Sequence, residues 1–174
     1  MAQKVKLSTI ADALKVSTAT VSLALRDSPL VAEATREKIK EQATLLGYIY
    51  NRRAASLRTS RSGIVGVVVH DIMNPFYAEI LRSIETELDK SRQTFVLSNH
   101  YDSVEKQRNF LETLMQLGAD GVIMSPAIGT PASDIKLAED NGLPAVLIAR
   151  SIENAAVPVF RGDDSFGIGL ATNH

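Results

Sequence analysis

The sequence predicts an all-α helix-turn-helix head followed by an α/β, doubly wound parallel sheet. Short amphipathic segments with a turn between them run from Ser8 to Leu25. A continuous apolar run, Ile64–Val69, is typical of a strand buried on both faces. Strands then alternate with helices, which indicates right-handed βαβ units. We therefore expect a head over residues 1–50, a short helical segment and linker over 51–62, and the sheet over 63–160.

The head is expected to contain three short helices. Ser8 or Thr9 is a suitable cap for the first helix, and Lys15-Val16-Ser17 forms the turn after it. Ser17 caps a second helix from Thr18 to Leu25, and a third runs from about Glu33 to Leu46 and stops at Gly47. The predicted inward-facing residues are Ile10, Ala11, Leu14, Val21, Ala24, Leu25, Ile39, Ala43 and Leu46.

The outward face of the second helix carries the first functional prediction. Thr18, Ala19, Ser22 and Leu23 face outward near the N-terminal end, where a recognition helix reads base edges. A plain three-helix bundle without a DNA role is the structural alternative. The spacing from Ala11 through Val16 to Val21 favours the DNA-binding interpretation.

Charge is distributed unevenly along a chain whose formal net charge is −1. Residues 1–62 hold 11 Lys and Arg against 5 Asp and Glu, whereas the remaining residues hold 8 against 15. A basic head on an acidic body fits DNA binding confined to the head, although chance asymmetry is the alternative. The sequence has no Cys, which excludes disulfides and thiol chemistry. No secretory signal or apolar run of membrane-spanning length is seen, so we expect a cytoplasmic protein without a membrane partner.

The elements of the sheet follow in a regular order after Ile64–Val69. Asn74-Pro75 begins a helix along which Phe76, Ile80, Ile84 and Leu88 recur every four residues. The expected elements after it are a strand at 94–98, a helix at 104–117, a strand at 121–124, a helix at 133–141, a strand at 145–148 and a further strand at 157–160.

Ligands of such sheets bind beyond the carboxyl ends of the strands. Those ends carry His70-Asp71, Asn99-His100-Tyr101, Ser125 and Ala149-Arg150. Together they can hydrogen-bond hydroxyl groups and offer an aromatic face, which indicates a sugar or similar polar metabolite. Alternatives stay open for single residues: Phe76 in the core, Asp71 as a helix cap, and both histidines as simple loop residues.

An enzyme is the main alternative from another functional class. No G-x-G-x-x-G follows the first strand, and no Walker A sequence is present. His70 and Asp71 are adjacent rather than arranged as a nucleophile and its base, and no His, Asp or Glu group has metal-ligand spacing. We expect no catalytic residue, no metal and no cofactor. A periplasmic sugar-binding protein would share the body but lack the head.

The head sequence resembles the DNA-binding region of the lactose-repressor (LacI/GalR) family. The stretches that carry the resemblance are VSTATVS, VAEATREKI, LGY and NRRAASLR, and VSLAL resembles the branch that contains the maltose-regulon repressor. The resemblance implies a sequence-specific transcriptional repressor that is controlled by a small sugar-like effector. It also implies double-stranded operator DNA as a partner, a homodimer in the full-length form, and a periplasmic-binding-protein-like body of which the first subdomain is present.

The resemblance assigns roles to residues of the head and of the segment after it. In the head it places Thr18, Ala19, Thr20, Ser22 and Leu23 at the DNA. Residues 51–58 match a hinge helix in which Leu57 is a minor-groove wedge, and Ala54 lets two such helices approach. The hinge residues placed at the DNA are Asn51, Arg52, Ala54, Leu57 and Arg58, with Arg53 also at phosphates. An ordinary basic linker is the alternative.

The same resemblance places six residues on the effector cleft. They are Asp71, Phe76, Tyr77, Asn99, Ser125 and Arg150. Phe76 and Tyr77 could stack on a sugar ring.

Two head positions depart from the pattern of the family. Lys15 stands where Gly or Asn suits a left-handed backbone, so Lys should cost about 1 kcal/mol there. Leu23 stands where Arg or His often hydrogen-bonds a base, and it can offer only apolar contact, for instance to a thymine methyl.

Residues 161–174 resemble the crossover into a second subdomain, which does not follow in this sequence. We therefore expect half an effector cleft and weak or absent dimerisation of this chain. The alternative function is a truncated, non-switching remnant of a repressor. Effector identity, operator sequence and the choice between repressor and activator are not predicted.

Overall fold

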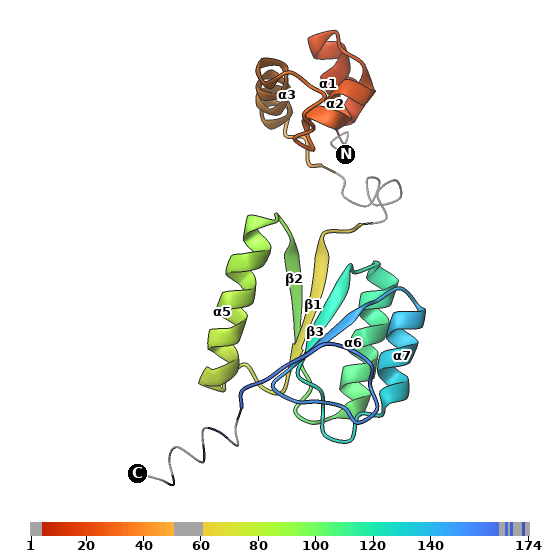
Figure 1. Cartoon of the computed structure of the whole chain (residues 1–174). Coiled ribbons are helices and arrows are strands. Elements are labelled where there is room, and N and C mark those ends of the chain that lie inside the picture. Colours follow the sequence, from red (N-terminus) through yellow and green to blue (C-terminus); the bar gives the residue numbers. More distant parts are fainter. Residues whose placement is uncertain (1–4, 51–60, 164–165, 167, 169–171, 173–174) are drawn as a thin grey trace. The chain divides into compact units, whose positions relative to one another are not determined.

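The computed structural model describes residues 5–50, 61–163, 166, 168 and 172 (Figure 1). The chain divides into two compact units, Met1–Arg52 and Arg53–His174. The predicted hinge residues Asn51, Arg52, Ala54, Leu57 and Arg58 lie outside the described residues. None of the helices in the described part of the chain is long and apolar enough to cross a membrane.

Residues 5–50 of the head hold three helices: α1 (Leu7–Leu14), α2 (Thr18–Ala24) and α3 (Glu33–Leu45). They enclose one small core, in which Ile10, Val21 and Ile39 are fully buried. α1 begins two to three residues earlier than predicted, because its N-cap is Lys6 instead of Ser8 or Thr9. Thr9 contributes in another way, because its Oγ1 accepts a hydrogen bond of 3.4 Å from the backbone N–H of Lys6.

The turn between α1 and α2 confirms two predictions. Lys15 has φ 53° and ψ 41°, the left-handed conformation expected at this position. Ser17 is the N-cap of α2, and its Oγ accepts a hydrogen bond of 3.0 Å from the N–H of Thr20. Gly47, with φ +66°, follows the last turn of α3 as a helix-terminating residue should.

The second unit is built on a five-stranded parallel sheet with the order β2-β1-β3-β4-β5. The strands are β1 (Ile64–Val69), β2 (Thr94–Asn99), β3 (Gly121–Met124), β4 (Ala145–Ile148) and β5 (Val159–Phe160). The helices that pack on the sheet, among residues 61–163, are α5 (Pro75–Lys90), α6 (Val104–Leu117) and α7 (Ala132–Asp140). α5 lies on one face of the sheet, and α6 and α7 lie on the other (Figure 1). The doubly wound fold is confirmed.

Strand β1, which lies between β2 and β3, is buried on both faces, as its continuous apolar sequence predicts. Val68 packs into the larger core under α6 and α7, with Leu114 and Ile135. Val67 and Val69 point to the opposite face, toward Tyr77 of α5. Successive side chains of a strand alternate between faces, so helices on both sides require apolar residues at every position.

The inner face of α5 differs from the predicted one. The expected row began with Phe76, but the side chain of Phe76 is 53% exposed and Tyr77 is 5% exposed. Tyr77 and Leu81 pack on the sheet together with Ile84, which the predicted row did include. An exact spacing of four residues drifts around a helix with 3.6 residues per turn, and a mixture of three and four keeps one face inward.

Candidate DNA-binding helix and ligand-binding face

The exposed residues of α2 are found near its N-terminal end. Thr18 and Ala19 are exposed, and Thr20 is half-buried with its Oγ1 2.9 Å from Ser17 Oγ. Short side chains at the first turn leave the backbone of this turn open to close approach by another molecule. This is the part of a recognition helix that contacts base edges in helix-turn-helix proteins.

Two residues that were predicted to face outward from α2 are not freely exposed. Ser22 is buried, with 4% of its surface exposed, so its predicted orientation is wrong. Leu23 is half-buried and packs against the head core. α2 is short and contacts both α1 and α3, so most of its circumference is covered.

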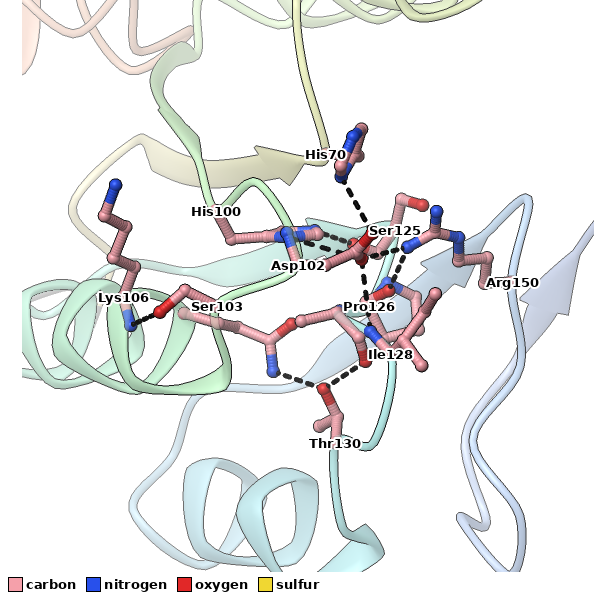
Figure 2. A network of polar contacts seen from close by, with 12 residues as sticks. His70, His100, Asp102, Ser103, Lys106, Ser125, Pro126, Ile128, Thr130 and Arg150 are labelled. Carbon is pink, nitrogen blue, oxygen red and sulfur yellow. Dashed lines mark hydrogen bonds and ion pairs between the residues drawn. The ribbon is translucent and has the colours of Figure 1, made fainter.

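The carboxyl ends of β1 to β4 form the second candidate site, which is organised by Asp102 (Figure 2). Its Oδ1 accepts hydrogen bonds from Arg150, over 2.5 Å, and from the N–H of Ile128, over 3.2 Å. Its Oδ2 lies 3.2 Å from His70 Nδ1. One carboxylate thus joins loops that follow β1, β2, β3 and β4.

The environment of Asp102 favours the charged carboxylate. Burial alone would raise its pKa, but the hydrogen bonds from Arg150 and Ile128 and the charge of Arg150 outweigh burial and hold the pKa below its ordinary value. Arg150 also donates to the carbonyl of Pro126 over 3.2 Å. The side chains of Asp102 and Arg150 are each about one-third exposed, so this ion pair borders solvent.

His100 is fully buried beneath Asp102 and both of its ring nitrogens have partners. Nδ1 accepts the N–H of Asp102 over 2.9 Å, and Nε2 lies 2.7 Å from the carbonyl oxygen of Ser125, to which it donates. This pattern requires the neutral tautomer with the proton on Nε2. Burial lowers the pKa of His100, in agreement with a neutral ring.

The ligand atoms of His70, His100 and Asp102 lie within 4.8 Å of one another, a spacing that a metal ion could bridge. The lone pair of His100 Nδ1 already accepts a backbone hydrogen bond, and Asp102 is paired with Arg150. A metal would have to displace these bonds and lie beside a guanidinium group. The three residues therefore fit a polar network better than a metal site.

The structure separates the six predicted effector residues into two groups. Asp71, Phe76, Asn99 and Arg150 are at least partly exposed. Tyr77 and Ser125 are buried, and Tyr77 Oη lies 2.9 Å from Ser125 Oγ. Their hydroxyl groups bond each other inside the unit, so neither side chain is exposed to a ligand in this conformation, and their contacts with an effector stay predictions.

The hydrogen bonds of Asp71 and Asn99 show what each side chain does within the structure. Asp71 Oδ1 accepts the N–H of Met73 over 2.9 Å, whereas Asn74 is the N-cap of α5. Asp71 therefore shapes the loop rather than capping the helix. Asn99 Nδ2 donates to Tyr101 Oη over 3.1 Å.

A hollow of about 550 Å³ lies beside Arg150. Its wall includes the loop from Pro126 to Thr130, and Ser151, Glu153 and Arg161 border it. The loop is held by the buried side chain of Gln107, which accepts the N–H of Ala127 over 2.8 Å and donates to Thr130 Oγ1 over 3.0 Å. The hollow has the size of a small-ligand site and a fixed wall.

Sequence reasoning missed Asp102 and Gln107. Asp102 precedes Ser103, the N-cap of α6, whose Oγ accepts the N–H of Lys106 over 3.2 Å. An acidic residue directly before a residue that already caps a helix is a usable signal, because its carboxylate is free for other partners. Gln107 lies in a helical pattern and carries no such signal.

Comparisons with known proteins agree with both parts of the structure. Residues 6–51 match the model of bacterial regulatory proteins of the lacI family, and residues 62–172 match that of periplasmic binding proteins and the sugar binding domain of the LacI family. The second match alone covers more than half of the chain.

Individual relatives are similar along almost the whole chain. The maltose regulon regulatory protein MalI of Escherichia coli K12 is 31% identical over 99% of this chain and 51% of its own length. The ribose operon repressor of Halalkalibacterium halodurans is 33% identical over 95% of this chain and 48% of its own length. The chain thus spans about half the length of these relatives, both of which are named as regulators rather than enzymes.

A solved structure supports the fold. The lac repressor dimer bound to operator and the anti-inducer ONPF superposes with a TM-score of 0.77 at 24% identity, over 99% of this chain and 52% of that one. With a helix-turn-helix head and a doubly wound sheet that both match models of one family, the chain belongs to the LacI family of bacterial regulatory proteins.

Proposed function

We propose that the protein is a sequence-specific DNA-binding transcriptional repressor controlled by a small, neutral, sugar-like effector. The observation that carries the proposal is the combination in one chain of a lacI-type head with a sugar-binding-type sheet. The proposed partners are double-stranded operator DNA, the effector, and a second copy of the chain in a homodimer. A regulator of bacterial DNA acts in the cytoplasm, and we propose no catalytic activity.

The proposed DNA contacts begin at the first turn of α2. Thr18 and Ala19 are exposed there, and Thr20 is close by. Leu23 is half-buried, so it would offer the edge of an apolar side chain, suited to a thymine methyl. The assignments of Asn51, Arg52, Ala54, Leu57 and Arg58 rest on the sequence alone. Ser22 is buried, and its proposed role is limited to supporting the helix.

The proposed effector lies against the carboxyl ends of the strands, beside Arg150. The guanidinium group has five N–H donors, and Nη1 is already bonded to Asp102 and Pro126. The remaining donors are held in a fixed orientation and can serve hydroxyl groups. Because the carboxylate of Asp102 offsets the positive charge, the site favours neutral polyols over anions. Asp71 and Asn99 would add polar contacts.

Selection of binding sites from a random duplex pool tests the DNA-binding half of the proposal. We expect an enriched sequence, with each mismatched base pair costing about 1–3 kcal/mol in a gel-shift titration. Ala19→Asp should abolish the enrichment by placing a negative charge at the DNA. Glu105→Ala on α6, an equally exposed position of the other unit, is the control and should leave it unchanged. Equal binding of all sequences would contradict the proposal.

Calorimetric titration tests the effector half. D-Ribose and maltose are the neutral probes, and D-gluconate is the anionic probe. We expect a neutral sugar to bind and gluconate to bind more weakly, and Arg150→Ala to remove binding. Arg108→Ala is the matched control. It breaks an ion pair between Arg108 of α6 and Asp134 of α7. A preference for gluconate would contradict a neutral effector.

The second candidate function is a non-switching form that binds DNA without an effector response. The exposed apolar surface of β5, where Phe160 is 66% exposed, is the observation that favours it. The two candidates differ in the calorimetric result, because a non-switching form binds none of the three probes.

A further inference from the structure

A second carboxylate with several hydrogen-bond partners, that of Asp120, lies at the amino ends of the strands. This is the end of the sheet opposite the proposed effector site. Oδ1 of Asp120 accepts the backbone N–H of Ser62 over 2.7 Å and the Ser62 hydroxyl over 3.1 Å. Oδ2 accepts the N–H of Gly63 over 2.9 Å. A carboxylate that accepts three hydrogen bonds from two adjacent residues holds that stretch of backbone firmly, since bonds to charged groups are the stronger ones.

The bonds of Asp120 act on the linker where it enters the sheet. Ser62 and Gly63 are the last residues before β1, and Asp120 is the last residue before β3. The carbonyl group of Gly63 has a partner as well, because it accepts the N–H of Thr94 at the start of β2 over 2.9 Å. Gly63 has φ +72°, a conformation that suits glycine and turns the chain into the strand.

The two strands held by Asp120 lead to the proposed effector face. β1 and β3 are adjacent and parallel, with Val65 opposite Gly121 and Val68 opposite Met124. At their far ends lie His70 and Ser125, which belong to the network around Asp102 and His100. The pair of β1 and β3 therefore connects the residues bonded by Asp120, at the amino ends of the strands, with the ligand-facing loops at their carboxyl ends.

We propose that Asp120 is a positioning residue that clamps the linker to the β1–β3 pair, so that the sheet controls how the head is presented to DNA. The clamp itself rests on the hydrogen bonds above, and its regulatory consequence rests on the proposed function. Without the bonds to Asp120, Ser62 and Gly63 would be released from the sheet and would lengthen the connection to the head. Specific binding would weaken more than binding to random DNA, since specific binding requires the heads to be held in one arrangement.

Limited trypsin digestion of the full chain tests the clamp without reference to DNA. The bond between Arg61 and Ser62 is a trypsin site, and its amide N–H is the group that donates to Asp120. Asp120→Asn keeps the shape of the side chain, but its NH₂ group cannot accept the N–H of Gly63. We expect cleavage after Arg61, followed by mass spectrometry, to become about ten-fold faster.

Two further variants keep this test interpretable. Ser62→Ala removes one of the three bonds and should accelerate the same cleavage by about three-fold, even where Asp120→Asn folds poorly. Asp134→Asn makes the same chemical change at an ion pair on α7 and should leave cleavage after Arg61 unchanged. Equal cleavage rates for wild type, Asp120→Asn and Ser62→Ala would overturn the clamp.

Gel shifts on a selected operator and on random DNA test the regulatory consequence. For Asp120→Asn we expect the ratio of specific to random affinity to fall by about ten-fold, while Asp134→Asn keeps the wild-type ratio. An unchanged ratio in a variant that trypsin cleaves faster would overturn control of the head by the clamp. Failure of the wild type to select any sequence would refute the proposed function and the regulatory consequence with it, whereas the trypsin result would still decide the clamp.

Discussion

Replacement of Lys15 by glycine should stabilise the head, because Lys15 holds a backbone conformation that disfavours any residue with a Cβ atom. Its φ of 53° and ψ of 41° lie in the left-handed region. An L-residue other than glycine loses about 1–2 kcal/mol there. The turn needs this conformation, since it lets α1 end and the N–H of Val16 reach the carbonyl of Ala11 over 3.0 Å.

The expected gain is smaller than the strain that is relieved. Glycine also makes the unfolded chain more flexible, which costs about 0.5–1 kcal/mol on folding. The difference leaves a net stabilisation of about 0.5–1 kcal/mol for Lys15→Gly. The Lys15 side chain is exposed, so no buried contact is lost with it.

Lys38→Gly is the matched control, because it removes the same charge and side chain from an exposed position. Lys38 lies inside α3, where the backbone is helical and glycine is unfavourable. This variant should destabilise the head by about 0.5–1 kcal/mol. The two substitutions therefore have the same chemistry and opposite expected signs.

Hydrogen exchange read by mass spectrometry on peptides from residues 5–50 can measure the head within the full chain. Lys15→Gly should slow exchange of the buried amides about two- to five-fold, the factor that corresponds to about 0.5–1 kcal/mol. Lys38→Gly should accelerate it by a similar factor. Exchange that is faster in Lys15→Gly than in wild type would refute the reasoning, since the left-handed backbone would then carry no strain.

Three further predictions concern single residues. Leu23→Arg should change the preferred base at one operator position by about 1–3 kcal/mol, and an unchanged selected sequence would refute a base contact by Leu23. Gly66→Ala should lower the unfolding temperature of the sheet in calorimetry, by about 1–3 kcal/mol of stability, because a Cβ there would lie 2.1 Å from Leu114 Cδ1. The pKa of His100 is lowered from 6.5, so the unfolded chain binds the proton more readily and stability falls as pH drops below about 6.5. His100→Gln, which keeps a donor for Ser125, should reduce this loss in urea titrations between pH 7 and 5, and an identical pH profile would contradict a neutral buried His100.

Local signals predicted most of the fold. The cap at Ser17 and the apolar run of β1 depend on neighbouring residues, whereas the left-handed backbone of Lys15 was expected from the resemblance to the LacI/GalR family. The structure confirms all three. The order of strands and helices followed from the alternation of their patterns, because parallel strands require helical crossovers. The ends of elements were predicted less well: α1 starts at Leu7, and the last strand is limited to Val159–Phe160.

Side-chain exposure in the two candidate sites could not be predicted in the same way. Ser22, Tyr77 and Ser125 were placed correctly along the chain, but each of them is buried. For Tyr77 and Ser125 the reason is a hydrogen bond between residues 48 positions apart. A sequence pattern indicates which end of a strand a residue occupies, whereas its availability to a ligand depends on partners that the fold brings together.

Asp102 illustrates how such a partner-dependent residue could still be found. Two adjacent polar residues, Asp102 and Ser103, precede α6, and one helix end needs only one N-cap. Ser103 takes that role, so the carboxylate of Asp102 is left over at the edge where ligands bind. A surplus carboxylate in a half-buried place requires a cation or N–H donors, and Arg150 was the one arginine predicted at that edge. Pairing surplus acids with cations on neighbouring strand ends would therefore have identified the Asp102–Arg150 bond, and with it the reason to expect a neutral effector.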